Sequence, residues 1–158
     1  MTDPEKLQIL LDRVEISEVV YRYATGADQL DADLFAAVFT DPLTVHIRGG
    51  SFGAGRQQTL PSPKFAQGVM KGLGRFAQTQ HLFSVYKVDV NGDQAQTLVY
   101  MHARHFIRES EGIHPPWDMG GYYTHHLERT ASGWKVREYS LDITWETNVA
   151  PRPSSRQS

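Results

Sequence analysis

The feature that most constrains the fold is a run of four long segments in the second half of the chain, each rich in β-branched and aromatic residues. They span residues 79–90, 94–108, 119–129 and 134–145. Residues 91–93, Asn-Gly-Asp, are a strong hairpin signal, and residues 130–133 form a second turn. The longer loop "ESEGIHPPWD" joins the two middle segments. Long strands with short connections predict an antiparallel meander.

The first half of the chain has helical periodicity instead. Asp3 and Pro4 are typical of the N-cap and first residue of a long helix, in which apolar residues then recur at helical spacing. Two shorter helices are expected at residues 31–39, capped by an aspartate, and 64–73, with a first strand at 43–48 between them. The sequence therefore predicts an α+β fold, with the helices on the concave face of a curved antiparallel sheet.

Composition narrows the classes of function. The 158 residues fit one domain, which we expect to span 1–158 with a flexible tail at about 148–158. Hydrophobic residues make up 40% and the net charge is −2 with no basic stripe, so nucleic acid is not an expected partner. Without cysteine, the chain has no disulfide, thiolate nucleophile or cysteine-based zinc site. No leader and no run of about 20 apolar residues is visible, so we expect no membrane partner and a cytoplasmic location.

Three residues are candidates for chemistry: Asp28, His81 and His105. Each has an ordinary structural interpretation, because a polar residue at a helix end and a lone histidine in a strand are both common. His102 and His105 form an H-x-x-H pair. Residues three apart on a strand point to opposite faces, so this pair cannot hold one ion. We therefore expect neither a metal site nor a cofactor.

The hairpin at residues 91–93 decides which histidine accompanies His81. A three-residue loop places His81 opposite Ala103, and His105 then shares a face with His81. A loop of only the first two residues places His81 opposite His102 instead, because a slip of one residue exchanges the two faces of a strand. Both loop lengths are common, so the sequence leaves the choice open.

Several stretches together resemble the SnoaL-like group of the nuclear-transport-factor-2-like superfamily. They are "VYRYATGADQLDADLFAAVFTD", "TQHLFS", the Gly-Asp hairpin and "GWKVREYSLDITWE", which extend from about Val14 to Glu146. Within this group the chain is similar to the scytalone dehydratases. The resemblance implies a cone-shaped, cystatin-like α+β fold. That fold hosts lyases, isomerases, cyclases and non-catalytic subunits, so it does not by itself define a function.

The resemblance also implies roles for individual residues. Asp28 occupies the place of the aspartate that ends the first long helix of the scytalone dehydratases, and His81 in "TQHLF" matches their catalytic histidine. His105 corresponds to their second active-site histidine, in the strand after the hairpin. At the places of two tyrosines that hold a water in these enzymes, this chain has Ala27 and Ile47. The acid–base residues are thus kept, whereas the residues that contact substrate differ.

These residues suit an elimination next to a carbonyl group. A neutral His81 is the base, Asp28 orients its ring, and His105 protonates the departing hydroxyl. The expected function is a cofactor-independent, dehydratase-like lyase acting on a small cyclic or aromatic substrate. The alternatives are an isomerase or polyketide cyclase with the same base, or a non-catalytic protein that binds small molecules or resembles a dioxygenase small subunit, in which side chains would fill the cone.

Other residues are expected to bind substrate or to close the pocket. They are Tyr23, Ile47, Phe52, Tyr100, Tyr123 and Trp145. The tyrosines offer hydroxyl donors, while Phe52 and Trp145 belong to segments expected at the mouth. The resemblance also implies a homo-oligomer, with a trimer favoured over a dimer and the outer face of the sheet as the contact.

Overall fold

A computed structural model describes residues 2–108, 110 and 112–149. Its elements are α1 (Asp3–Gln29), α2 (Ala32–Ala37), β1 (Phe39–Gly49), the 3-10 helix η1 (Gly50–Phe52), β2 (Gln58–Leu60), α3 (Ser62–Leu73), β3 (Gln78–Asn91), β4 (Gln94–Phe106), β5 (Trp117–Thr130) and β6 (Gly133–Thr147). The expected tail falls mostly on residues 150–158, which lie outside the described part. Within the described part, no helix is long and apolar enough to cross a membrane.

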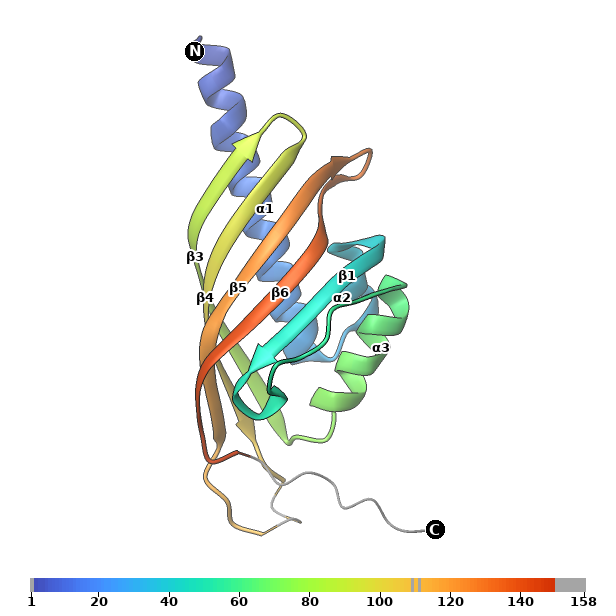
Figure 1. The fold of residues 1–158 in the computed structure, drawn as a ribbon, viewed down its shortest axis with the longest axis vertical. Helices are drawn as coiled ribbons and strands as arrows, with labels where there is room; N and C mark the ends of the chain where they lie inside the picture. The colour runs from blue at the N-terminus through green and yellow to red at the C-terminus, as the bar shows by residue number, and fades with distance from the viewer. Residues whose placement is uncertain (1, 109, 111, 150–158) are drawn as a thin grey trace.

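The six strands form one curved sheet in the order β2-β1-β6-β5-β4-β3 (Figure 1). Strands β3 to β6 make the predicted antiparallel meander. The sheet is mixed at one place, because β1 runs parallel to β6, a pairing that the sequence did not indicate. Parallel neighbours need a long connection, and the residues between β1 and β6 supply one. The short strand β2, which the sequence did not indicate, extends the sheet beyond β1.

Helix α1 supports the site only through its second half. There Ile16, Val20 and Ala27 are buried against the sheet and the other helices. The first turns project beyond the end of the sheet (Figure 1), and their leucines are exposed. The helix begins one residue earlier than predicted, because Thr2 is the N-cap and its backbone N–H donates to the Glu5 carboxylate at 2.5 Å.

The β3–β4 hairpin has one of the two pairings that the sequence left open, but neither of the two loops. Asn91 pairs with Gln94, so the turn contains only Gly92 and Asp93, and Gly92 has a positive φ of 59°. A register shift farther along β3, between Val85 and Lys87, then displaces the pairing by one residue. His81 therefore lies opposite Ala103, as a three-residue loop would have placed it.

Candidate active site

Asp28 and His81 are in direct contact where the last turn of α1 meets the start of β3. His81 Nδ1 lies 2.6 Å from Asp28 Oδ1, and the backbone N–H of His81 donates to Asp28 Oδ2 at 2.8 Å. The hydroxyl of Thr79, two residues earlier on the same face of β3, donates to Asp28 Oδ1 at 2.9 Å. Three donors from one strand thus fix both oxygens of the carboxylate.

These contacts determine where the proton of the His81 ring lies. Burial raises the pKa of Asp28, but the hydrogen bonds from His81 and Thr79 outweigh it, so the pKa is lowered overall. An ionised carboxylate can only accept, and Nδ1 of His81 must therefore carry the proton. In the neutral ring, the lone pair is then on Nε2, on the side of the ring away from Asp28. The His81 side chain is only 8% exposed.

His105 lies beside His81 in a more apolar setting. The ring centroids of the two histidines are 5.8 Å apart, and the His105 ring stacks on Trp117 at 4.8 Å. Burial, with a smaller effect of the neighbouring His81, lowers the pKa of His105 to about 4. Its Nδ1 lies 3.2 Å from the Trp117 carbonyl oxygen, which can only accept, so Nδ1 is protonated. His105 is thus neutral near pH 7 and offers an acceptor at Nε2, which does not favour the predicted proton donation.

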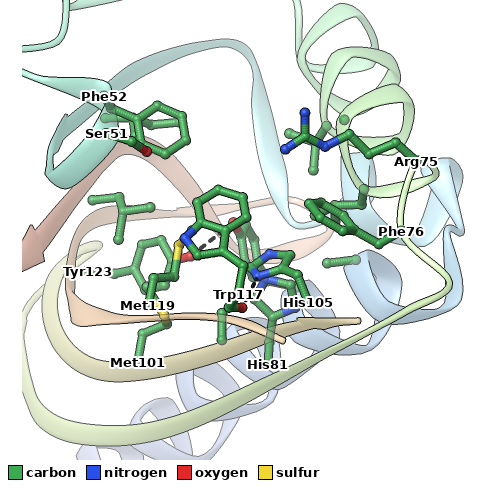
Figure 2. Close-up of a pocket in the computed structure, with 18 of the residues that line it drawn as sticks. Ser51, Phe52, Arg75, Phe76, His81, Met101, His105, Trp117, Met119 and Tyr123 are labelled. Carbon is green, nitrogen blue, oxygen red and sulfur yellow. Dashed lines mark hydrogen bonds between the residues drawn. The ribbon is translucent and has the colours of Figure 1, made fainter. Parts of the chain in front are cut away.

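A cavity of about 590 Å³ opens beside the two histidines (Figure 2). It is lined by Tyr23, Ala27, Ile47, Ser51, Phe52, Val69, Gly72, Leu73, Arg75, Phe76, His81, Met101, Ala103, His105, Trp117, Met119, Tyr123, Tyr139, Leu141 and Val149. Most of these side chains are apolar, as is usual for a small-molecule site. The predicted residues Tyr23, Ile47, Phe52 and Tyr123 belong to this lining.

Three tyrosine hydroxyls meet in the wall of the cavity. The hydroxyl of Tyr23 lies 2.8 Å from that of Tyr139 and 3.4 Å from that of Tyr123. Burial raises the pKa of all three tyrosines, most strongly for Tyr123 and Tyr139, so all three are neutral hydrogen-bond donors. No sequence motif had indicated Tyr139. Tyr139 precedes Leu141, which also lines the cavity, by two residues on β6. Alternate residues of a strand share a face, so this spacing is the signal that could have identified Tyr139.

Tyr100 and Trp145 are corrections to the predicted site, because neither lines the cavity. Tyr100 is 53% exposed, and it lies between Val99 and Met101, whose side chains are buried. Trp145 is 46% exposed, and its ring lies 5.5 Å from that of His102. Alternation along β4 turns Tyr100 and His102 outward while their neighbours point inward.

The lining also contains charged and aromatic residues that the sequence analysis missed, above all Arg75, Phe76 and Trp117. Arg75 and Phe76 lie in the short connection between α3 and β3, where no periodic pattern indicates which way a side chain points. Trp117 begins β5, two residues before the predicted start of that strand. Among the described residues, no three histidine or carboxylate side chains gather closely enough to hold a metal ion.

The sequence pattern of the SnoaL-like domain matches residues 8–140, which is most of the chain. The chain belongs to the SnoaL-like family. Its structure is similar to that of a protein from Kribbella flavida, with a TM-score of 0.82, 29% identity, and coverage of 89% of this chain and 95% of that one. The family predicted from the sequence is therefore confirmed.

Two more distant structures show the same fold. A provisionally named scytalone dehydratase of Novosphingobium aromaticivorans is 20% identical with a TM-score of 0.74, covering 94% of this chain and 97% of that one. A hexachlorocyclohexane dehydrochlorinase of Novosphingobium barchaimii is 17% identical with a TM-score of 0.73, covering 93% and 96%. The predicted cone-shaped, nuclear-transport-factor-2-like fold is thus confirmed, and it is one that such enzymes of small molecules share.

Proposed function

We propose that this protein is a lyase that eliminates water next to a carbonyl group of a small cyclic or aromatic substrate. The observation that carries the proposal is the 2.6 Å contact between His81 Nδ1 and Asp28. The same histidine lines a largely apolar cavity. Asp28 holds the ring in the tautomer that leaves Nε2 free as a base. It also stabilises the imidazolium that forms when Nε2 takes a proton.

The elimination proceeds in two balanced stages. Nε2 of His81 removes the proton from the carbon next to the carbonyl, and the electrons of the C–H bond form an enolate. The enolate then collapses to a carbon–carbon double bond as the neighbouring C–O bond breaks. The departing hydroxide takes the proton from the His81 imidazolium and leaves as water, which restores the neutral base.

The other polar groups of the cavity have supporting roles in this scheme. Neutral hydroxyls such as that of Tyr123 donate to the enolate oxygen, where negative charge develops. Nε2 of His105 accepts a hydrogen bond from the hydroxyl of the substrate and positions it for departure. This replaces the acid role expected for His105, because a group with a pKa of about 4 is rarely protonated at neutral pH.

The non-catalytic alternative requires a cone filled by side chains. A cavity of about 590 Å³ beside the Asp28–His81 pair argues against that alternative. An isomerase or cyclase uses the same base without expelling a leaving group, so analysis of the products separates it from a lyase.

The proposal is tested with a bicyclic β-hydroxy ketone, 3-hydroxy-1-tetralone, whose dehydration yields 1-naphthol with a large change in absorbance. We expect turnover by the native protein, and a loss of about 10²–10⁴-fold in kcat/KM for His81→Gln and Asp28→Asn, the range typical for loss of general acid–base catalysis. His102→Gln is the matched control, since this histidine lies on the outer face of the same sheet and should leave turnover unchanged.

Native-like turnover in both His81→Gln and Asp28→Asn would contradict the proposed base. Exchange of the α-proton with solvent without release of 1-naphthol would indicate an isomerase-type reaction with the same base, and would contradict the dehydratase assignment. Circular dichroism of each variant verifies that the fold is intact.

A further inference from the structure

Arg75 is the charged side chain of the cavity that the proposed elimination does not use. Of the described residues that line the cavity, it alone carries a permanent positive charge. Its guanidinium lies over the ring of Phe76 at 4.6 Å and within 6.0 Å of the Trp117 ring. Figure 2 shows Arg75 and Phe76 on one side of the cavity, across from Ser51 and Phe52, with the guanidinium turned toward the space between them.

The guanidinium of Arg75 has no carboxylate partner among the described residues, in contrast to those of three other arginines. Arg48, Arg104 and Arg129 form ion pairs with Asp142, Asp118 and Asp12, respectively. Within residues 2–108, 110 and 112–149, no carboxylate lies within 4.0 Å of Arg75. The aromatic rings pack against the half-buried guanidinium, whereas its N–H groups point along the plane and can donate to an acceptor in the cavity.

Arg108 holds the backbone at Arg75 in place through two hydrogen bonds. Arg108, just beyond the end of β4, donates from Nε to the Arg75 carbonyl oxygen at 3.1 Å and from Nη2 to that of Gly74 at 2.9 Å. These bonds tie the end of α3 to the sheet. The hydrogen bonds from Arg108 therefore hold the backbone of Arg75 in position beside the cavity.

The carboxylates of Asp28 and Glu146, which lie near the cavity, already accept hydrogen bonds from protein groups. Asp28 lies behind His81, which donates to it, and does not line the cavity. Glu146 accepts from the hydroxyl of Ser51 at 3.0 Å and from the indole of Trp117 at 3.2 Å, and it also lies outside the lining. The described lining thus has a positive charge without a negative one.

We infer that Arg75 binds a carboxylate of the substrate, so that the natural substrates are small cyclic or aromatic carboxylic acids. The guanidinium matches a carboxylate through two parallel N–H···O bonds, which a neutral group cannot reproduce as strongly. The hydrophobic body of such a ligand packs against Phe76, Met101 and Trp117, and its reactive end reaches His81. The inference deepens the proposed function and, as a statement about substrates, rests on it.

The carboxylate has a second effect on the site. Arg75 contributes to the lowered pKa of His105 by charge repulsion, after burial and the effect of His81. A bound carboxylate neutralises this contribution. The anionic ligand therefore makes the neighbourhood of His105 less positive at the moment when the substrate is in place.

Binding of two ligands of equal shape tests the inference without reference to turnover. The probes are 1-naphthoate and its neutral analogue 1-naphthamide, titrated calorimetrically at pH 8, where His105 is neutral. We expect the native protein to bind naphthoate at least about tenfold more tightly than naphthamide, the ratio that a charge-assisted hydrogen-bond pair provides. Arg75→Gln should abolish this preference, and Arg75→Lys should retain part of it.

Arg137→Gln is the matched control, because it removes the same charge from an exposed position of β6 outside the lining and should keep the full preference. Equal affinity of the native protein for both ligands, absence of naphthoate binding, or an unchanged preference in Arg75→Gln would each overturn the inference. His81→Gln separates it from the proposed function. That variant should keep the naphthoate preference while losing turnover, so either claim can fail alone.

Discussion

Two histidines on β4, three residues apart, have opposite surroundings. His105 is 3% exposed, stacks on Trp117 and lies beside His81 in the cavity. His102 lies on the outer face, near Trp145 and with its Nε2 3.5 Å from Asp118 Oδ1. The residue type is the same, and the chemical setting is decided by the direction in which the strand turns each side chain.

The two faces of the whole sheet differ in the same way. The inner face carries the apolar core, the cavity and Asp28's partner His81. The outer face carries ion pairs such as Arg104–Asp118 and Arg48–Asp142, together with exposed aromatic residues. The expected trimer contact belongs to this outer face and stays a prediction. A histidine or tyrosine of this sheet can therefore be assigned to the candidate site only when the face of the sheet that it occupies is known.

The largest effect expected from this comparison concerns stability. Leu127 on β5 is fully buried and Leu82 on β3 is 56% exposed on the outer face. Leu127→Ala should lower the free energy of unfolding by about 2–5 kcal/mol, because it removes buried methyl groups and leaves a void. Leu82→Ala, the same chemical change, should stay within about 0.5 kcal/mol of the native value. Urea unfolding at pH 7.5 measures both, and equal losses would show that the two faces are not distinguished in solution.

A smaller effect separates the two histidines by pH. The pKa of His105 is lowered from 6.5 to about 4, so between these values the unfolded chain binds a proton that the native state does not. Stability therefore falls as the pH is lowered through this window, and His105 alone contributes a loss of about 2 kcal/mol between pH 7.5 and 5. Buried His125, whose pKa is lowered to about 3 mainly by burial, adds a loss of the same sign.

Urea unfolding at the two pH values gives the contribution of each position. His105→Gln should reduce the pH-dependent loss by about 2 kcal/mol. His102→Gln, on the outer face of the same strand, should retain the native loss. A His105→Gln variant with the full native loss would show that this imidazole is not held neutral inside the fold.

The sequence predicted much of the fold because its signals there are local. The meander follows from four long β-type segments and their turns, and helix α2 from the capping Asp31, whose side chain accepts from the Leu34 backbone N–H at 2.9 Å. The parallel pairing of β1 with β6 joins segments far apart in the chain. No local pattern encodes that pairing, so the sequence predicted only the antiparallel part of the sheet.

The candidate site was predictable where a motif or an alternation fixed the residue. Asp28 and His81 came from the family resemblance, and the structure brings them into contact. The residues alone left the register, and with it the choice between His102 and His105, open, and the resemblance favoured His105. The hairpin places His105 on the face of His81 through a two-residue turn and a later register shift. Arg75 lies in an irregular connection, where neither a motif nor an alternation indicates that its side chain reaches the cavity.

The proposed mechanism requires that Asp28 hold the His81 ring in one tautomer, with the proton on Nδ1 and the lone pair on Nε2. Two-bond ¹H–¹⁵N correlation spectra of the protein labelled at histidine, recorded at pH 8.5, report the tautomer of each ring. The account predicts the Nδ1–H tautomer for His81 in the native protein, and loss of that preference in Asp28→Ala, which removes the acceptor. A native His81 with its proton on Nε2 would leave no lone pair facing the cavity and would contradict the account.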